Sequence, residues 1–419
     1  MTASIDAVTA WEVLDSRGTP TVRVAVECGD RRGTFTVPSG ASTGTHEAHE
    51  RRDDDERFDG KGVRKAIAAV NDELGPAVVG HDVTDRSGLD ATLVEADGTE
   101  TLHRYGANAI LGVSGAALHA ASAVLDQRLY AYLADGSAPT LPVPMVNVLS
   151  GGLHARGGFE VQDVLVVPVD ASRFRDAIET VWDVRQAVRD RVVAEGHRPL
   201  VADEGGFAPP VDTVEDAFAY VEDAITTAGY VPNEDVALAV DVAASHFYDA
   251  DRGVYELESA GETLAPRHMI DHVVQWVEDY PIVSVEDPLD EGDWEAWERL
   301  ASRLPENIQL LGDDLLVTNL QRLDRAVEEG AASAVLIKPD QAGTFTRTFE
   351  VVERAKASGV APVVSARSGE TCDSTIADIA VGLNAGQIKI GSLARSERLA
   401  KYNRLLEIET TAGLELSSL

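Results

Sequence analysis

Apolar and polar positions divide the chain into two differently organised parts. Residues 21–27 alternate Val22, Val24 and Val26 with polar neighbours, which is the period-2 pattern of a half-buried strand. Residues 33–37 are expected to pair with that strand across a turn at 28–32, and helical patterns follow at about 62–74 and 107–133. The first part is therefore predicted to contain strands followed by helices.

A change of composition separates the two parts. Residues 135–144 contain three prolines and one glycine, which favours a linker. We therefore predict two domains, residues 1–134 and residues 135–419.

The second part consists of short apolar runs alternating with helix-like segments, and each run is flanked by a conspicuous polar residue. The run 164–168 is preceded by Gln162 and Asp163, and the run 200–202 leads into Asp203 and Glu204. Later runs lead to Asp241, Glu286, Asp313, Lys338, Arg367 and Lys389. The intervals between them are close to one strand-plus-helix unit, which predicts a β/α barrel whose site lies at the carboxyl ends of its strands.

Three carboxylates at successive strand ends, Asp241, Glu286 and Asp313, are expected to converge at that face. At 4 Å each pair would repel by about 4 kcal/mol at an effective dielectric constant near 20, so the cluster requires a cation. Hard oxygen ligands without Cys or His favour Mg²⁺. Capping of the following helix is the alternative for any one of these acids.

Two lysines follow the same pattern. Burial at a strand end favours a neutral amine at Lys338, which would make it a candidate base, with a structural ion pair as the alternative. Lys389, Arg367 and Ser368 together predict a clamp for phosphate or carboxylate. Glu204 could protonate a leaving hydroxyl group if burial raised its pKa, although a solvated loop acid is the simpler interpretation.

Composition restricts the partners and the location. The chain has 419 residues, 71 Asp+Glu against 36 Lys+Arg, a formal net charge of -35 and two cysteines. This balance argues against nucleic acids and anionic membranes. The amino-terminal residues lack a signal-peptide pattern and the apolar stretch 109–125 is too short to span a bilayer comfortably, so a cytoplasmic protein is expected.

A metal, a lysine base, a candidate acid and an anion clamp suit one reaction class. That class is proton abstraction beside a carboxylate, with the metal stabilising the enediolate, followed by loss of a group from the neighbouring carbon. Glycine-rich stretches at 39–44 and 150–154 are expected to form mobile loops that close over such a site.

At this point the chain resembles the enolase family along nearly its whole length. The resemblance is carried by residues 13–20, 37–44, 106–114, 203–209, 284–288, 312–314, 367–371 and 395–403. It implies an α/β fold, with an amino-terminal α+β domain packed on a modified TIM-type β/α barrel, and a homodimer. Enolase-superfamily sites are themselves an established example of metal-assisted enediolate chemistry.

The resemblance also implies roles for individual residues. Lys338 would remove the proton from carbon 2 of 2-phosphoglycerate, and Glu204 would assist departure of the hydroxyl group on carbon 3. Two Mg²⁺ ions are expected, the first held by Asp241, Glu286 and Asp313 and the second by Ser42 with the substrate phosphate. Arg367 and Ser368 would hold the phosphate, Lys389 the carboxylate, and His154 would contact the substrate from its loop.

Two positions depart from the family pattern. Asp163 stands where the family has glutamate, and Ala366 stands where it has histidine. In the family both positions belong to the side of the site that holds the leaving hydroxyl group and the phosphate. Asp163 therefore stays among the catalytic candidates. One interpretation is an ordinary enolase that tolerates these exchanges. Another is a diverged paralogue for a modified phosphorus-containing substrate, phosphorylated or phosphonate, such as carboxyphosphonoenolpyruvate synthase. A third is a non-catalytic binding protein with this fold.

Overall fold

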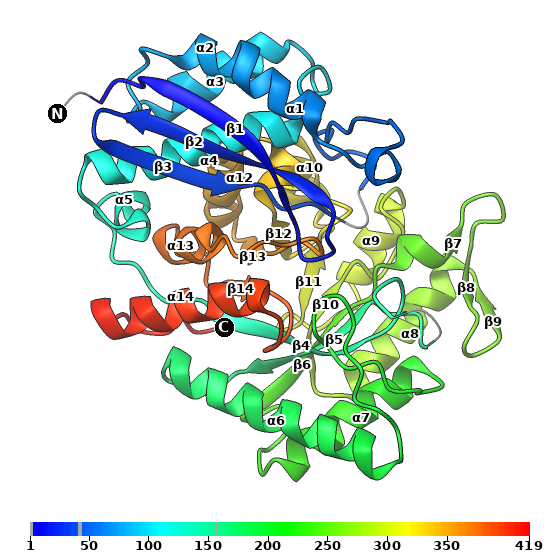
Figure 1. Ribbon diagram of the computed structural model, residues 1–419. Helices are drawn as coiled ribbons and strands as arrows, with labels where there is room; N and C mark the ends of the chain where they lie inside the picture. The colour runs from blue at the N-terminus through cyan, green and yellow to red at the C-terminus, as the bar shows by residue number, and fades with distance from the viewer. Residues whose placement is uncertain (1–2, 41–43, 156–157) are drawn as a thin grey trace.

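The computed structural model describes residues 3–40, 44–155 and 158–419. Its amino-terminal part contains an antiparallel sheet in the order β1-β2-β3, and helices cover this sheet (Figure 1). The three strands are β1 (Ala7–Leu14), β2 (Pro20–Cys28) and β3 (Arg31–Thr36). The helical elements are η1 (Arg57–Gly60), α1 (Arg64–Ala69), η2 (Val70–Leu74), α2 (Gly75–Val78), α3 (Arg86–Asp97), α4 (Ala107–Val124) and α5 (Leu129–Ala134).

Helix α4 forms the core of this part because it is apolar on nearly every face. By length and composition it could cross a membrane, but 89% of it is buried inside the protein. Its glycines allow close packing: a Cβ at Gly112 would lie 2.6 Å from Val24 Cγ2, and one at Gly115 would lie 2.5 Å from the Phe35 ring. The helix expected over 107–133 is in fact two helices, separated by a turn at 125–128.

The second part is built on a closed eight-stranded barrel in the order β10-β11-β12-β13-β14-β4-β5-β6. Its strands are β4 (Val143–Ser150), β5 (Asp163–Pro168), β6 (Val236–Asp241), β10 (Ile282–Glu286), β11 (Gln309–Gly312), β12 (Ala334–Ile337), β13 (Ala361–Ser365) and β14 (Gln387–Lys389). Strand β5 runs antiparallel to both of its neighbours, and the other pairs are parallel. The predicted α/β barrel is thereby confirmed, with one reversed strand.

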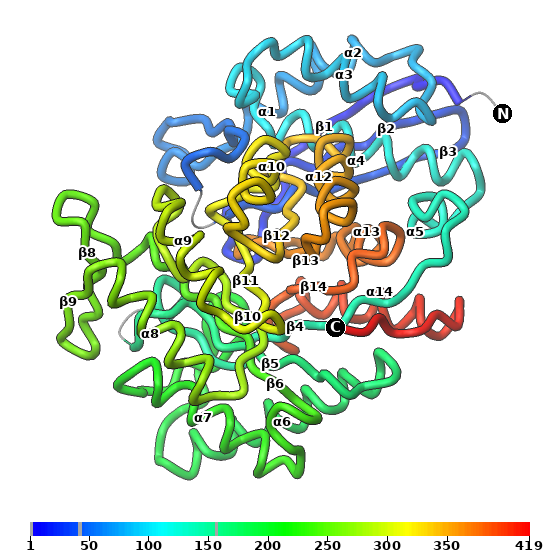
Figure 2. The backbone as a smooth tube through the Cα atoms, turned by 180° about the vertical axis from the view of Figure 1, so that it is seen from behind, coloured from blue at the N-terminus to red at the C-terminus, as the bar shows by residue number. Residues whose placement is uncertain are grey.

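Helices surround the barrel, and α10 and α12 face the amino-terminal part (Figures 1 and 2). They are α6 (Phe174–Ala194), α7 (Val214–Thr227), α8 (Pro266–Asp279), α9 (Trp294–Ala301), α10 (Leu320–Glu329), α11 (Pro339–Ala342), α12 (Phe345–Ser358), α13 (Thr375–Gly382) and α14 (Ser396–Ala412). A turn η3 (Ala244–Phe247) leads into a small sheet that projects from the barrel, β7 (Tyr248–Asp249), β8 (Val254–Leu257) and β9 (Glu262–Leu264).

Two predictions from the apolar runs are wrong. Residues 200–202 form no barrel strand, and Leu200 is 65% exposed. The strand that completes the barrel is β4, which begins at Val143 inside the stretch expected to be a linker. All eight residues of β4 are buried, so this strand carries no polar alternation that would mark it.

Candidate active site at the barrel mouth

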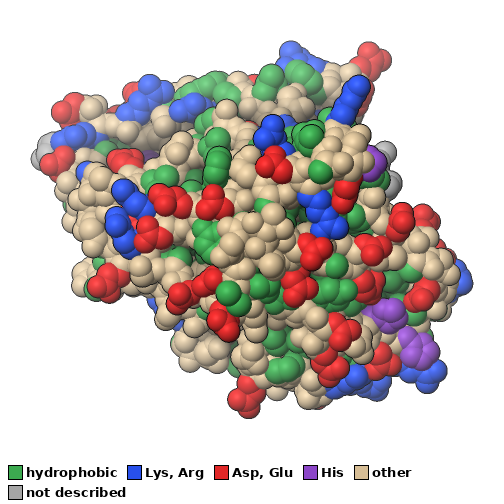
Figure 3. All heavy atoms as spheres, turned by 90° about the horizontal axis from the view of Figure 1, so that it is seen from below, with side chains coloured by type: hydrophobic (Ala, Val, Ile, Leu, Met, Phe, Trp, Pro, Cys, Tyr) green, Lys and Arg blue, Asp and Glu red, His purple; other side chains and the backbone are tan. Residues whose placement is uncertain are grey.

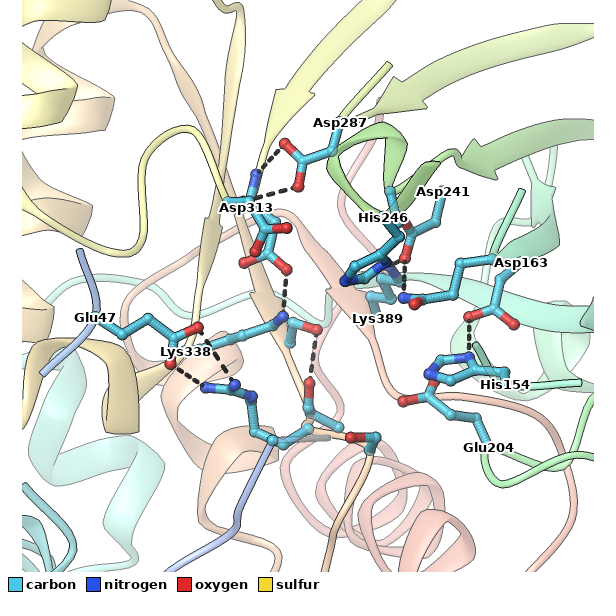
Figure 4. A pocket seen from close by; sticks show the side chains of 18 residues that line it. Glu47, His154, Asp163, Glu204, Asp241, His246, Asp287, Asp313, Lys338 and Lys389 are labelled. Carbon is cyan, nitrogen blue, oxygen red and sulfur yellow. Dashed lines mark hydrogen bonds and ion pairs between the residues drawn. The ribbon is translucent and has the colours of Figure 1, made fainter. Parts of the chain in front are cut away.

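Every second residue of a barrel strand faces the interior, and the candidate functional residues are the inward-facing ones at one end of the barrel. Leu165, Ala239, Leu311, Leu336 and Val363 belong to the apolar cluster that fills the barrel interior. Two positions further along each parallel strand, on the same face, the chain places Asp241, Asp313, Lys338 and Ser365. On the reversed strand β5 the corresponding residue comes two positions earlier and is Asp163. These residues line one pocket at the carboxyl-terminal mouth (Figure 4).

The three predicted metal-binding acids lie on adjacent strands. Glu286 is paired in register with Asp241, and Asp313 follows the next strand, β11. The ammonium nitrogen of Lys389 lies 2.7 Å from Asp241 Oδ2 and 2.6 Å from Glu286 Oε2. This ammonium group therefore provides positive charge between two of the acids.

The donor set fits a hard divalent cation. All three predicted ligands offer carboxylate oxygens, as Mg²⁺ prefers. Burial and the neighbouring Asp241 carboxylate raise the pKa of Glu286 well above its ordinary value, against the opposing influence of Lys389. The charged form of Glu286 is therefore disfavoured at this position, and a bound cation would stabilise it. Ser42, the expected ligand of a second ion, lies outside the described residues.

Asp287 is a fourth acid in this cluster. Together with Glu286 and Asp313 it forms a group of carboxylates close enough to share a metal ion. Its two oxygens, however, accept hydrogen bonds from the backbone N–H groups of Asp313, at 3.0 Å, and Asp314, at 2.7 Å. Asp287 thus fixes the turn that presents Asp313.

Lys338 follows β12 and forms an ion pair with Asp313, which Figure 4 shows across the pocket. Burial alone would lower the pKa of Lys338, but the Asp313 carboxylate outweighs it and raises this pKa above its ordinary value. The ion pair that the sequence offered as the alternative is thus present, and the role of Lys338 as a base stays a prediction. Gln341 also contacts Asp313, with Nε2 2.8 Å from Oδ1.

Asp163 and His154 form a buried pair on the other side of the pocket. His154 Nδ1 lies 3.0 Å from Asp163 Oδ2, while Asp163 Oδ1 accepts from Asn147 and, at 2.8 Å, from Ser150 Oγ. Burial lowers the pKa of His154, but the Asp163 carboxylate outweighs it and raises the value to about 9. His154, Asp163 and Glu204 also approach closely enough to share a metal, but hydrogen bonds already occupy Asp163.

Glu204 lies in the loop between α6 and α7, and its carboxylate points into the pocket (Figure 4). Asp203 is exposed, whereas Glu204 is buried. Burial raises the pKa of Glu204, but Arg398 and then His154 lower it, and the net direction is below the ordinary value. The predicted role of Glu204 as an acid needs a raised pKa, and the charges of Arg398 and His154 oppose that direction.

Arg367 and Ser368 follow β13 and also line the pocket. The guanidinium group of Arg367 lies 3.1 Å from Glu47 Oε2 and 2.6 Å from Asp340 Oδ2. The guanidinium group that is predicted to bind an anion is thus paired with two carboxylates of the protein. Ala366 lies beside it, 7% exposed, with its N–H donating to the Lys389 carbonyl at 2.9 Å.

Sequence reasoning missed several residues of the pocket. Glu47, His246, Asp287, Asp314 and Asp340 line it or contact its residues. Asp287 and Asp314 each directly follow a predicted ligand, and Asp340 comes two positions after Lys338, so proximity in sequence was an available signal. Glu47 and His246 come from loops whose course no local pattern predicts.

A closed barrel with acids and lysines at its mouth defines an enolase-superfamily lyase. Comparison with protein families gives the same result: the model of the enolase amino-terminal domain matches residues 5–133. The model of the enolase carboxyl-terminal TIM barrel domain matches residues 138–417. The chain belongs to the enolase family.

Proposed function

We propose that the protein is a magnesium-dependent enolase-type lyase. It would remove the carbon-2 proton of 2-phosphoglycerate, or of a close analogue, and expel the carbon-3 hydroxyl group to form an enol phosphate. One observation carries this proposal: Lys338, Glu204 and Arg367 reach the same pocket from three different loops. A base, a group that assists hydroxyl departure and an anion holder are what the reaction requires.

In this proposal Lys338 accepts the carbon-2 proton. Its ammonium group is paired with Asp313, so that ion pair has to open and the amine has to lose its proton first. Mg²⁺ bound by Asp241, Glu286 and Asp313 would supply positive charge for the carboxylate of the substrate. Glu204 would assist the departing hydroxyl group.

The remaining residues would bind and orient the substrate. Arg367 and Ser368 would hold the phosphate, and Lys389 would hold the carboxylate after leaving its two acidic partners. His154 and Asp163 would act on the leaving-group side, where their buried pair supplies a cationic imidazole. Strand ends and buried contacts fix the backbone of these residues, so the change on binding would be an exchange of ion-pair partners by their side chains.

The test is formation of phosphoenolpyruvate from 2-phosphoglycerate, followed by ultraviolet absorbance, together with exchange of the carbon-2 proton in D₂O. We expect both reactions to stop on removal of Mg²⁺ with EDTA and to return when it is added back. Lys338→Met should abolish both reactions. Lys356→Met is the matched control, because Lys356 is exposed on α12, and it should change neither.

The possible failures are distinguishable. Exchange without phosphoenolpyruvate formation would mean that 2-phosphoglycerate is not the natural substrate. Absence of both reactions, with no Mg²⁺-dependent ligand binding, would contradict the lyase proposal and leave a binding protein with this fold.

A second candidate is a paralogue acting on a substrate with a modified phosphorus group, such as a phosphonate. The supporting observation is Ala366, whose small side chain lines the pocket beside Arg367. A methyl group at this position leaves room and offers no hydrogen-bond donor. Turnover of a phosphonate analogue but not of 2-phosphoglycerate would favour this candidate.

We also propose that the protein works in the cytoplasm as a homodimer with a small anionic substrate. The face shown in Figure 3 has Asp and Glu side chains spread over it with Lys and Arg interspersed, which supports the absence of a nucleic-acid partner. Light scattering coupled to size-exclusion chromatography tests the dimer, and a monomeric mass would overturn it.

A further inference from the structure

Helix α14 presents three buried polar side chains to the back of the catalytic loops. Arg398, Lys401 and Tyr402 have the spacing that places side chains on one helical face, and each is at most 2% exposed. Tyr402 Oη donates to the Gly391 carbonyl at 2.7 Å, and Lys401 Nζ lies 2.6 Å from Glu370 Oε2. This face of α14 therefore supports the loops that follow β13 and β14.

Arg398 is the member of this group that reaches the candidate site. Its Nη1 donates to the Ile390 carbonyl at 2.9 Å, and its Nη2 donates to the Ser368 carbonyl at 2.8 Å. The same Nη2 lies 3.6 Å from Glu204 Oε1. Ile390 directly follows Lys389 and Ser368 directly follows Arg367, so one guanidinium group contacts three loops that carry site residues.

The Glu204 loop packs closely on this support. The Ser392 N–H donates to the Glu204 carbonyl at 2.9 Å. Gly391 has φ of +110°, and a Cβ there would lie 3.0 Å from the Glu204 carbonyl oxygen and 3.1 Å from Arg398 Cδ. A residue larger than glycine at position 391 would therefore displace either the Glu204 backbone or the Arg398 side chain.

The charge of Arg398 also has a consequence for Glu204. A buried carboxylate without a counter-ion is strongly disfavoured. Arg398 provides a fixed positive charge from α14, on the side of Glu204 away from the pocket. His154, Lys389 and Lys338 face Glu204 from the pocket side, but Lys389 and Lys338 are paired with other acids. Arg398 is the cation that the backbone holds at Glu204 through two carbonyl groups.

We propose that Arg398 is a positioning residue that holds the Glu204 carboxylate in register with the loops of Arg367 and Lys389. This inference rests on the proposed function, in which Glu204 assists departure of the hydroxyl group while Lys338 removes the proton. Loss of Arg398 should therefore impair the elimination step and leave the proton-removal step largely intact.

The experiment compares Arg398→Met and Arg398→Lys with Tyr402→Phe, which removes a neighbouring hydrogen bond of the same helix face without changing charge. Carbon-2 proton exchange in D₂O and phosphoenolpyruvate formation are measured with 2-phosphoglycerate. Arg398→Met should lower product formation by about 100-fold, because a catalytic group displaced by about 1 Å loses its alignment with the departing hydroxyl group, and should change exchange by less than about threefold. Arg398→Lys should recover part of the loss, because an ammonium group keeps the charge but not the fork of donors.

Equal loss of exchange and product formation in both Arg398 variants would overturn the proposal, since that is the behaviour of a merely structural residue. When Arg398→Lys is added to Glu204→Gln, the rate of product formation should fall little further, because the two residues act through one step. Tyr402→Phe should lower both rates equally and by less than about threefold.

Failure of the proposed function is recognised separately, because wild-type protein would then show neither reaction. Crystal structures of the Arg398 variants decide the positioning role in that case. We expect the Glu204 carboxylate to be displaced while the barrel strands stay in place. An unmoved Glu204 would overturn the inference whatever the substrate is.

Discussion

The ammonium nitrogen of Lys389 lies 2.6 Å from Glu286 Oε2 at the barrel mouth. The same ammonium contacts Asp241, so a lysine predicted to bind a substrate carboxylate is paired with two predicted metal ligands. The acids raise the pKa of Lys389 well above its ordinary value despite burial. If Asp241 and Glu286 bind Mg²⁺ as proposed, Lys389 and Mg²⁺ would compete for the same oxygens.

This competition predicts the behaviour of Lys389→Met. Without Mg²⁺ the variant should lose about 3–5 kcal/mol of unfolding free energy, because two buried carboxylates lose their counter-ion. Its affinity for Mg²⁺ should rise by about tenfold, since the competing cation is gone. Urea unfolding and calorimetric titration with MgCl₂ in the absence of substrate measure the two effects.

Lys356→Met again provides the control, because the exposed Lys356 lies on α12 away from the acids. It should leave both the unfolding free energy and Mg²⁺ affinity unchanged. Weaker Mg²⁺ binding by Lys389→Met would show that the two cations occupy different positions.

The His154–Asp163 pair predicts a pH dependence of stability. The pKa of His154 is about 9 in the folded protein, above the value of about 6.5 for an unfolded chain. A raised folded pKa means that the stabilisation is fully present below about pH 6.5 and is lost as pH rises through about 9. Urea unfolding between pH 6 and 10 should show this loss in the wild type and not in His154→Asn.

His197→Asn serves as the comparison, because His197 is exposed just beyond the end of α6 and forms no ion pair with any residue that the structure describes. Its curve should parallel that of the wild type over the same range. If the wild-type and His154→Asn curves also run parallel, the imidazole is not held as a cation by Asp163.

Ala366 predicts a gain of activity on substitution. Ala366→His should raise kcat/KM for 2-phosphoglycerate by about tenfold, because an imidazole fills the space beside Arg367 and adds a donor for an anionic group. Ala366→Leu fills the space without a donor and should give no gain. No gain with histidine either would mean that this position does not limit activity on the phosphate ester.

The net charge of -35 predicts stabilisation by salt. Repulsion among surface carboxylates opposes the compact state, and salt screens it over a Debye length that falls from about 30 Å at 0.01 M to about 3 Å at 1 M. The Tm should rise over this range of KCl. Sucrose controls for solvent exclusion; an equal rise with sucrose would remove the electrostatic explanation.

Much of the fold was predictable because the barrel strands end in polar residues that an apolar run makes conspicuous. Asp241, Glu286 and Lys389 are the last residues of their strands, and Lys338 directly follows its own. Strand β1 was missed for the opposite reason: only one of its eight residues, Ala10, is buried, so no alternation appears. The reversed direction of β5 has no local signal, because a fully buried strand has the same pattern in either direction.

The sequence allowed most residues of the site to be predicted, but not which of them form ion pairs with one another. Position along the strands placed Lys338 and the three predicted metal-binding acids at the same face of the barrel, yet the direction of the lysine pKa depends on whether burial or the neighbouring charge is stronger. The same holds for Glu204, because Arg398 lies far along the chain and only the tertiary structure brings them together. When burial and a neighbouring charge shift a pKa in opposite directions by similar amounts, the net direction cannot be predicted without the distances between the groups.

Closure of the barrel by β14 against β4 has a consequence during synthesis of the chain. Gln387 pairs with Val143, so the ring of strands stays open until β14 has left the ribosome. Asp241 and Glu286 emerge before Lys389, the ammonium group that pairs with both of them, has been translated. The nascent protein therefore passes through a stage in which only water or dissolved cations can neutralise these two carboxylates.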